Sequence, residues 1–244
     1  MPIKVLVNGA FGRMGQLVAK AVQETPALEL VGQTGREYDL LKSIKDSHAD
    51  VVVDFTHPES IARNLQTIIE SGARPVIGTT GLSVDVVKKF QAQCDELKLG
   101  GIIAPNFSIG AVLMMKAAKE IVKYMPNVEI IELHHDNKAD SPSGTSLRSA
   151  EMMASAVKEV NQPKKSSIET IKGARGANHL GIPIHSVRLK GFLAHEEIIF
   201  GNTGETLTLR HDSIDRACFM PGVCFACEKV MTLDKLVYGL EEVL

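Results

Sequence analysis

The sequence contains no tryptophan, only four cysteines and no long apolar run. A helix that crosses a bilayer needs roughly 20 consecutive apolar residues, and no stretch of this chain approaches that length. The N-terminal segment MPIKVLVNGA is too short and too interrupted by glycine to be a signal peptide. We therefore expect a cytoplasmic protein with no membrane partner. The absence of tryptophan excludes no class of chemistry.

The four cysteines stand at positions 94, 218, 224 and 227, a number that fits a reducing compartment. Cys224 and Cys227 have the spacing of a redox pair. They lie, however, in a long apolar segment without a second cysteine pair or a nearby histidine. We interpret them as buried residues of a helix.

An excess of charge of one sign is also lacking, since 27 basic and 29 acidic residues give a net charge of -2. No strongly basic face is expected, so composition gives no reason to predict a nucleic-acid partner. Hydrophobic residues make up 44% of the chain and charged residues 23%, as in ordinary globular proteins. A chain of 244 residues can form one large domain or two modest ones.

A glycine-rich turn near the N-terminus is the first motif with a functional meaning. The β-rich run Ile3–Asn8 precedes GAFGRMG, residues 9–15, and an amphipathic stretch follows it. Strand, glycine turn and helix in this order predict a dinucleotide-binding fold, in which the pyrophosphate binds at the helix N-terminus. The spacing Gly-x-x-Gly-x-x-Gly is not the commoner Gly-x-Gly-x-x-Gly. The motif therefore gains most of its weight from its place between a strand and a helix.

The second predicted strand, Leu28–Thr34, ends where such folds select the adenosine ribose. An acidic residue at this point binds the 2′-hydroxyl of NAD, whereas an arginine favours the 2′-phosphate of NADP. Both types are present, as Arg36 and Glu37. The cofactor is thus NADPH or NADH, and Arg36 favours NADPH.

Strands and helices continue to alternate in the next part of the chain. The predicted strands cover residues 50–55, 74–78 and 101–104, and the predicted helices cover 57–72, 83–97 and 109–125. This alternation predicts an α/β domain with a Rossmann-like, doubly wound parallel sheet. The turns after the last two strands, residues 78–81 and 105–108, are expected to line the same crevice as the first glycine turn.

The stretch Glu132–Thr145, ELHHDNKADSPSGT, concentrates ionisable side chains. Residues 128–135 alternate like a strand and then become polar, so His134 and His135 are expected at its C-terminal end, on opposite faces. Residues 141–145 predict a helix start, where free backbone N–H groups form an anion-binding turn. Together with Lys138, these groups indicate a small acidic substrate that receives a proton.

Other interpretations of this stretch are a zinc site, simple helix capping and a strand end with satisfied histidines. Adjacent strand residues diverge, and no His-x-x-x-His spacing or nearby cysteine completes a zinc ligand set. We therefore expect no metal.

Short strands dominate the last third of the chain. Residues 184–190, 195–200 and 205–211 are predicted to form an antiparallel meander, which indicates a second, α+β domain with a mixed, largely antiparallel sheet. Loops are predicted at 161–167 and 173–179. Residues 214–231 predict a buried helix, interrupted at Pro221, that returns to the first domain. The predicted domains are thus residues 1–106 with 215–244, and residues 107–214.

The motifs GAFGRMG, VVVDFTHPE, VIGTTG, APNFSIG and ELHHDNKADSPSGT, in this order, resemble the 4-hydroxy-tetrahydrodipicolinate reductase family. This family, also called dihydrodipicolinate reductase, belongs to the diaminopimelate route to lysine. Weaker similarity in SVRLKGFLAHEEIIF, ETLTLRHDSIDR and GLEEVL extends the resemblance over nearly the whole chain. It implies a dicarboxylate substrate, a hydride from NADH or NADPH, and a homotetramer assembled through the sheet of the second domain.

The resemblance also implies roles for individual residues. His134 matches the proposed proton donor and acceptor, and Lys138 matches the proton donor, so both are predicted catalytic residues. The predicted substrate contacts are His135, Gly144 and Thr145. The predicted cofactor contacts are Gly9, Ala10, Phe11, Gly12, Arg13, Met14, Arg36, Gly78, Thr79, Thr80, Ala104, Pro105, Asn106 and Phe107. Ser141 departs from the alanine that is common in the family. The loop before the second-domain strands is short and divergent, so Arg175 and His179 are not among the predicted substrate contacts.

Two other classes of protein remain open. One is a different dehydrogenase of the same architecture, either like aspartate dehydrogenase or of the semialdehyde type, the latter with a nucleophilic cysteine after a strand. None of the four cysteines stands near the anion-binding turn in the sequence. The other is a non-catalytic nucleotide sensor, which would need the glycine turn but would have no use for His134, Lys138 and Gly144 together.

Overall fold

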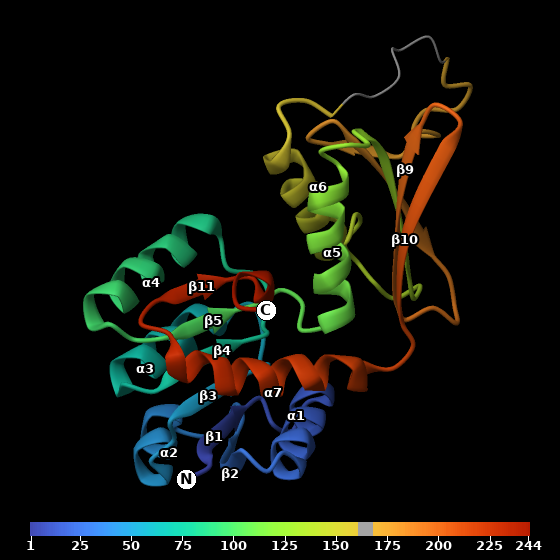
Figure 1. The fold of residues 1–244 in the computed structure, drawn as a ribbon. Coiled ribbons are helices and arrows are strands. Elements are labelled where there is room, and N and C mark those ends of the chain that lie inside the picture. Colours follow the sequence, from blue (N-terminus) through green and yellow to red (C-terminus); the bar gives the residue numbers. More distant parts are fainter. Residues whose placement is uncertain (161–167) are drawn as a thin grey trace. The chain divides into compact units, whose positions relative to one another are not determined.

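The computed structural model describes residues 1–160 and 168–244, so the loop predicted at 161–167 lies outside the described residues. The chain divides into two compact units (Figure 1). Unit 1 comprises residues 1–109 and 216–244, and unit 2 comprises residues 110–215. The borders predicted from the sequence, at 106/107 and 214/215, lie close to these.

Unit 1 contains a six-stranded sheet in the order β11-β5-β4-β3-β1-β2, and every strand pair in it is parallel. Its strands are β1 (Ile3–Asn8), β2 (Leu28–Thr34), β3 (Val51–Asp54), β4 (Arg74–Ile77), β5 (Gly101–Ile103) and β11 (Leu236–Tyr238). The parallel sheet predicted from the sequence is confirmed, and β11 is an addition that the sequence did not predict. Because β1 lies between β2 and β3, the order reverses at β1, and ligands of such sheets bind at the carboxyl ends of the strands at this point.

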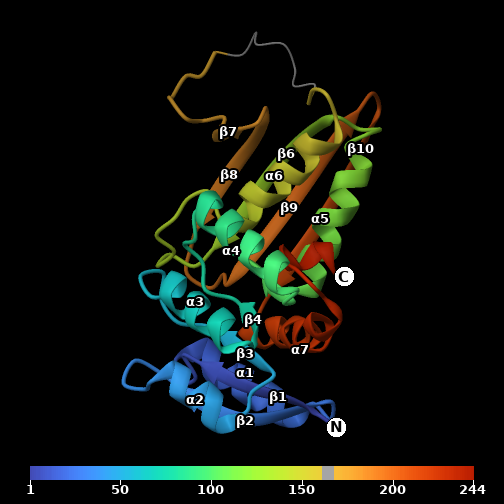
Figure 2. The same ribbon diagram turned by 90° about the vertical axis from the view of Figure 1, so that its left-hand side faces the viewer.

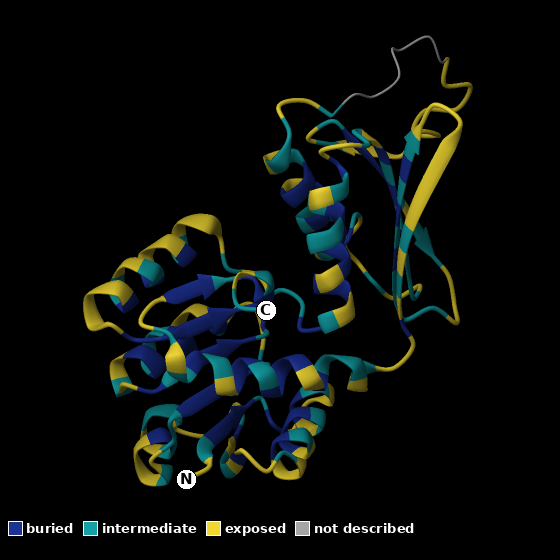
Figure 3. Ribbon diagram, viewed as in Figure 1, coloured by how far each residue is buried: buried dark blue, intermediate teal, exposed yellow. Residues whose placement is uncertain are grey.

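Helices cover both faces of this sheet. They are α1 (Arg13–Glu24), α2 (Leu40–Ser47), α3 (Ile61–Ser71), α4 (Val84–Leu97) and α7 (Met220–Lys229), with short 3₁₀ helices at Arg216–Phe219, Val230–Thr232 and Leu240–Glu242. Side chains of α2, α3 and α4 share one core with Leu6 and Val52 of the sheet. Helices α1 and α7 contact each other as well as β1 and β2, on the opposite face. The buried strands of unit 1 are dark blue in Figure 3.

Two helical predictions need correction. Helix α2 was not predicted, and it begins after Asp39, whose carboxylate accepts a hydrogen bond from the Lys42 amide at 3.0 Å. The helix predicted over residues 214–231 is shorter than expected, because α7 begins only at Met220. Pro221 therefore does not interrupt it. Proline stands in the first turn, where its missing N–H leaves no hydrogen bond unmade.

Unit 2 contains a five-stranded sheet in the order β10-β9-β6-β8-β7. Its strands are β6 (Asn127–His134), β7 (Ala177–His179), β8 (Ile182–Arg188), β9 (Ala194–Asn202) and β10 (Glu205–Ser213). Only the β6–β8 pair is parallel, so the sheet is mixed and largely antiparallel, as predicted. The predicted meander is wrong in one respect, because β6 lies between β8 and β9. The predicted loop at 173–179 also ends in β7, which pairs with β8.

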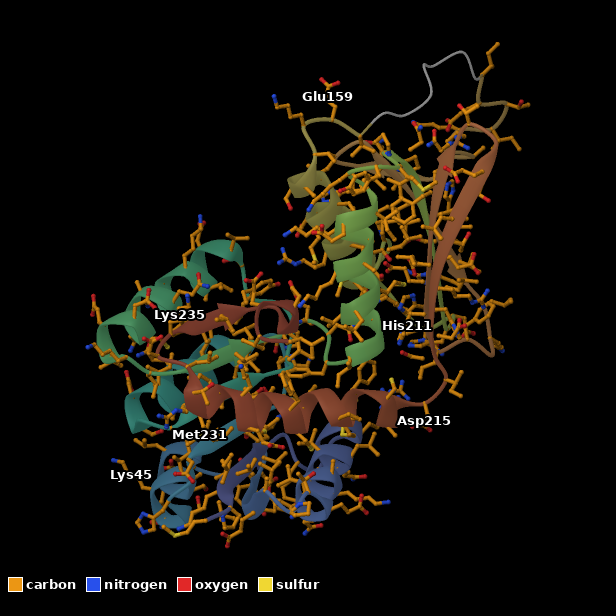
Figure 4. The ribbon with its side chains drawn as sticks, in the orientation of Figure 1. Lys45, Glu159, His211, Asp215, Met231 and Lys235 are labelled. Atoms are coloured by element: carbon orange, nitrogen blue, oxygen red, sulfur yellow. The ribbon has the colours of Figure 1, made fainter. Side chains whose placement is uncertain are left out.

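Helices α5 (Ile109–Ile121) and α6 (Gly144–Ala156) lie on one face of this sheet (Figures 1 and 2). The core between them is built from Met114, Ala118, Ala150, Met153, Ile130, Ile198 and Phe200. His211, near the C-terminal end of β10 (Figure 4), faces the start of α5. A Cβ atom at Gly110 would lie 2.8 Å from its ring, so glycine lets the helix approach the strand. Among the described residues, no helix is long and apolar enough to span a membrane.

Candidate active site

The glycine turn of unit 1 connects β1 to α1 through three glycines with different surroundings. Gly9 has a φ of +81°, and a Cβ there would lie 2.3 Å from the Phe55 carbonyl oxygen. A Cβ at Gly15 would lie 2.0 Å from the Gly9 carbonyl oxygen. At Gly12, the N-cap of α1, the nearest atom would be 3.4 Å away. Gly9 and Gly15 therefore allow the turn to pack tightly, whereas Gly12 leaves open space in front of the helix N-terminus.

This open space belongs to a cavity of about 1100 Å³ at the carboxyl ends of β1, β2 and β3. Four predicted cofactor contacts line it, namely Gly9, Phe11, Gly12 and Arg36. The Phe11 ring stacks on the Tyr38 ring at a centroid distance of 5.7 Å, and both rings are about half exposed. Ala10 is buried, and Arg13 and Met14 form the first turn of α1; none of the three lines the cavity. Glu37, the acidic alternative to Arg36, does not line it either.

A buried polar network supports this end of the sheet, and the sequence reasoning missed it. The Asp54 carboxylate at the end of β3 is fully buried. It accepts hydrogen bonds from Asn8 Nδ2 at 2.7 Å, Asn64 Nδ2 at 3.0 Å and Thr79 Oγ1 at 2.7 Å. It also accepts one from Thr56 Oγ1 at 2.7 Å. Asp54 thus ties the end of β1 to the turns that follow β3 and β4.

The two later turns that were predicted to contact the cofactor do not line this cavity. Thr79 is buried on Asp54 and Thr80 is exposed, while a Cβ at Gly78 would lie 2.2 Å from the Phe55 ring. Ala104 and Phe107 are buried, and Pro105 and Asn106 are partly exposed. Close packing against the Phe55 ring therefore explains the glycine at position 78, and the hydrogen bond to Asp54 explains the Thr79 hydroxyl. Their contact with a cofactor stays a prediction.

In unit 2, Glu132 connects the side chains of the central motif. It shares the inner face of β6 with Val128 and Ile130, and it is 0% exposed. Its Oε2 lies 2.5 Å from His134 Nδ1. Both oxygens also accept hydrogen bonds from Arg188 on β8, at 2.9 Å from Nη1 and 2.8 Å from Nη2. A fully buried carboxylate thus holds the histidine ring on one side and a guanidinium on the other.

The loop after β6 brings Lys138 to the same network. Its Nζ lies 2.7 Å and 2.8 Å from the two carboxylate oxygens of Asp140. Arg188 Nη2 donates to the Asp140 carbonyl oxygen at 2.7 Å, so one arginine links the loop to Glu132. His135 lies just beyond β6, which ends at His134. The opposite-face argument of the sequence therefore does not apply to His135, whose carbonyl accepts from the Lys138 amide at 3.1 Å.

The charges of these carboxylates follow from their partners. Burial raises the pKa of Glu132, but hydrogen bonds from His134, Arg188 and Ser186 outweigh it and lower this pKa from 4.5 to about 2. Burial likewise raises the pKa of Asp140, and the hydrogen bond and charge of Lys138 together with the charge of Arg188 lower it below its usual value. Both carboxylates are therefore ionised at neutral pH, each against a cation.

The turn that starts α6 has the geometry of an anion-binding site. Ser143 is the N-cap, and its Oγ accepts from the Ser146 amide at 3.2 Å. Gly144 is exposed, and a Cβ there would have no neighbour within 4 Å. Thr145 follows it, partly exposed. This turn lies at the positive end of the helix dipole, where a negative charge is favoured.

The structure joins the central motif into one hydrogen-bonded network and adds residues that the sequence reasoning had not selected. Glu132 links His134 and Arg188, and Arg188 links the Lys138 loop. Directly opposite Glu132, on β9, stands Glu196, which is bonded to the first turns of α6. A signal for both carboxylates existed, because each stands next to two buried apolar residues on the same strand face, Val128 and Ile130 for Glu132 and Ile198 and Phe200 for Glu196. An alternating pattern, however, does not show which side chains a buried carboxylate is hydrogen-bonded to.

Cys224 and Cys227 are buried in α7, as interpreted from the sequence, and burial raises the pKa of the Cys224 thiol. No group of three or more His, Cys, Asp or Glu side chains that could hold a metal occurs within residues 1–160 and 168–244.

Comparison with known proteins follows the same division of the chain. Residues 3–107 match the family model described as "Dihydrodipicolinate reductase, N-terminus", and residues 110–244 match "Dihydrodipicolinate reductase, C-terminus". The 4-hydroxy-tetrahydrodipicolinate reductase of Coxiella burnetii (strain Dugway 5J108-111) is 54% identical over 245 residues, with full coverage of both chains. The enzyme of that name from Legionella pneumophila (strain Lens) is 49% identical over 244 residues, again with full coverage.

Solved structures agree with this comparison. A dipicolinate-bound dihydrodipicolinate reductase from Paenisporosarcina sp. TG-14 superimposes with a TM-score of 0.90 at 41% identity, covering 100% of both chains. GenD2 from gentamicin A biosynthesis, in complex with NAD, has a TM-score of 0.66 at 12% identity, covering 94% of this chain and 85% of that one, and shows the fold alone. On two family models that together span almost the whole chain, and on full-length relatives at about half identity, the chain belongs to the dihydrodipicolinate reductase family.

Proposed function

We propose that this protein reduces 4-hydroxy-tetrahydrodipicolinate to tetrahydrodipicolinate with a hydride from NAD(P)H, a step of the diaminopimelate pathway of lysine biosynthesis. The observation that carries this conclusion is the full-length likeness to reductases of that name. The network of the central motif in unit 2 supplies the chemistry for such a dicarboxylate substrate. The fold, by contrast, is shared with distant dehydrogenases and does not discriminate between reactions.

Binding of the substrate is assigned to the start of α6 and to the histidines. The helix N-terminus at Gly144 and Thr145 suits one carboxylate, and His134 and His135 suit the other. The ionised Glu132 fixes His134 through Nδ1, which directs the other ring nitrogen away from the buried carboxylate. The basic side chains next to this site are thus oriented by carboxylates, His134 by the buried Glu132 and Lys138 by the exposed Asp140.

The chemical step needs a proton after the hydride. Loss of water from the 4-hydroxy substrate gives a ring imine conjugated to an alkene, and the nicotinamide supplies, when bound, a hydride to ring C4. The product of that addition is an enamine, whose neighbouring ring carbon takes up a proton. We assign the proton to Lys138, whose ammonium is held at 2.7 Å by the ionised Asp140 and is partly exposed. A cation beside a dianionic substrate supplies both charge and a proton.

The cofactor is assigned to the cavity of unit 1, and the residues there fit a dinucleotide. Gly12 leaves room in front of the N-terminus of α1 for a pyrophosphate, and the cavity has the size of a cofactor site. Arg36 lines the cavity whereas Glu37 does not. This difference supports NADPH as the preferred donor, because a guanidinium pairs well with a 2′-phosphate. The turns at Gly78–Thr80 and Ala104–Phe107 are proposed as further contacts on resemblance alone.

We further propose a cytoplasmic homotetramer that assembles through the sheet of unit 2. Helices α5 and α6 occupy one face of that sheet, and the strand residues that point away from them include Ile131, Leu133 and Ile199, which are only partly buried. Partly exposed apolar side chains on a sheet face favour association. Sedimentation velocity tests the proposal, and a mass near that of one chain, 26.4 kDa, contradicts it.

The test of the reaction is a coupled assay at 340 nm. Substrate is generated in the cuvette by the preceding synthase from pyruvate and aspartate semialdehyde, and NADPH or NADH is added with purified protein. Oxidation that depends on the synthase is expected, faster with NADPH than with NADH. If neither cofactor is oxidised by protein shown to bind both, the reductase assignment is wrong.

A further inference from the structure

Glu196 is a buried carboxyl group that the proposed mechanism does not use. It lies on β9 and is 4% exposed, on the same sheet face as Ile198 and Phe200. Its Oε2 accepts a hydrogen bond from Ser146 Oγ at 2.7 Å, and its Oε1 accepts one from Ser149 Oγ at 2.5 Å. Both serines are fully buried on α6. Since a buried carboxyl group without partners is strongly unfavourable, these two hydroxyls account for its presence in the core.

One of these hydroxyls leads back to the start of the helix. Ser146 Oγ lies 2.8 Å from the Oγ of Ser143, the N-cap, and both side chains are buried. Ser143 Oγ in turn accepts from the Ser146 amide. A continuous chain of hydrogen bonds therefore runs from Glu196 through Ser146 to Ser143. It ends one residue before Gly144 and Thr145, to which we assign a substrate carboxylate.

The groups around Glu196 favour its neutral form. Burial raises the pKa of Glu196; the hydrogen bonds from Ser149 and Ser146 oppose this, and the negative charge of Glu132 raises the pKa further. Glu132 stands opposite Glu196 on β6, and His211 stands opposite it on β10. Burial lowers the pKa of His211, which favours the neutral imidazole. Because the raised pKa shows no requirement of the surroundings for a charged group, an uncharged glutamine of the same shape is a suitable replacement for Glu196.

From this geometry we propose that Glu196 is a positioning residue for substrate. Through Ser146 it fixes the N-cap Ser143, and with it the direction of the N–H groups that receive a substrate carboxylate. This inference rests on the proposed function in assigning a carboxylate to the start of α6. Ser149 also binds Glu196 but has no contact with Ser143 among the described hydrogen bonds of residues 1–160 and 168–244. Ser149 therefore attaches α6 to the sheet but is not part of the hydrogen-bond chain that reaches Ser143.

The two serines form a matched pair for the test. Ser146→Ala breaks the hydrogen-bond chain to the N-cap. Ser149→Ala, about one helical turn later, also removes a hydroxyl that donates to Glu196, but leaves that chain intact. Glu196→Gln keeps the shape and can bond both serines, through its carbonyl oxygen and its amide group. Dipicolinate, a dicarboxylate that cannot be reduced by the same addition, serves as the ligand, and its affinity is measured by calorimetry in the presence of NADPH.

We expect Ser146→Ala to weaken dipicolinate binding and raise the substrate KM by about tenfold, as for loss of one aligned hydrogen bond. The kcat and the affinity for NADPH are expected to stay within about twofold, as expected for lost ground-state binding. Ser149→Ala is expected to lower the thermal midpoint without this loss of affinity. Glu196→Gln is expected to bind dipicolinate about as tightly as the unchanged protein. If a negative charge at this position were required, this variant would bind dipicolinate more weakly.

Two results would overturn the inference. In the first, Ser146→Ala is folded and binds dipicolinate as tightly as the unchanged protein, so the chain only stabilises the fold. In the second, both serine variants lose affinity equally, so the route to Ser143 has no special role. Failure of the proposed reaction is distinguishable from both, because it would appear as absent NADPH oxidation by the unchanged protein, while calorimetry needs no turnover.

Discussion

Glu132 offers a sharp test of the network, through the substitution Glu132→Gln. The carboxylate is 0% exposed and is the acceptor for both His134 and Arg188. Glutamine has nearly the same shape as glutamate but no charge, and its amide NH₂ group would face an N–H group of His134 or Arg188. The substitution therefore removes the carboxylate that accepts from both terminal nitrogens of Arg188, whose side chain is 19% exposed. Breaking a buried pair in this way typically costs about 3–5 kcal/mol.

The pKa of Glu132 gives an independent magnitude. Each pH unit by which folding lowers a pKa corresponds to about 1.36 kcal/mol, so the fall from 4.5 to about 2 corresponds to about 3 kcal/mol of stability. Because the folded-state pKa is the lower one, this contribution is fully present above pH 4.5 and is lost as the pH falls towards 2. By about pH 3, linkage predicts that more than half of it has disappeared.

Urea unfolding of the unchanged protein and of Glu132→Gln, measured between pH 7 and pH 3, checks this reasoning. We expect a difference of about 3 kcal/mol at pH 7 that narrows steadily below pH 4.5. Glu120→Gln is the control, because the Glu120 side chain is 66% exposed and its ion pair with Lys123 lies on the surface, and it should change stability by less than about 1 kcal/mol. A difference that is small at pH 7, or one that does not narrow in acid, refutes the assignment of Glu132 as an ionised buried anchor.

Three further predictions concern catalysis and the cofactor. Lys138→Ala should lower kcat by about 10²–10⁴-fold while NADPH affinity, measured by fluorescence titration, stays unchanged; normal turnover would remove Lys138 from the proton transfer. Gly12→Val should abolish NADPH binding, because its side chain would fill the open space before α1, and an unchanged circular dichroism spectrum with retained binding would contradict the pyrophosphate assignment. Arg36→Ala should weaken NADPH by about tenfold or more and NADH by much less; equal losses would mean that Arg36 does not bind the 2′-phosphate.

Local patterns in the sequence were enough to predict much of unit 1. The run Ile3–Asn8, its glycine turn and the following helix appear where expected, because strand period, glycine and helix period are all encoded within about twenty residues. Helix α2 was missed because its eight residues make barely two turns. Strand β11, like β5 only three residues long, was missed because no long helix follows it to mark it as part of the strand–helix alternation.

Pairing partners in unit 2 were less accessible to the sequence. The strands β8, β9 and β10 were expected as neighbours in chain order, but β6 separates β8 from β9. Alternation specifies which face of a strand is apolar and not which strand lies beside it. For the same reason, the local sequence was enough to identify His134 and Lys138 as candidate site residues. It could not show that Arg188, which lies 50 residues beyond Lys138 in the sequence, links them.

The edge strand β11 has a consequence for how the chain folds during synthesis. It pairs with β5 at the end of the six-stranded sheet, yet it is translated more than a hundred residues after that strand. Helix α7, which covers β1 and β2, is translated equally late. The first 109 residues must therefore leave the ribosome with one edge of β5 unpaired and with the part of the sheet that α7 covers exposed, and both features favour aggregation. The strands of unit 2 pair with one another and can form their sheet first, so residues 1–109 of unit 1 complete their fold only after residues 216–244 have been made.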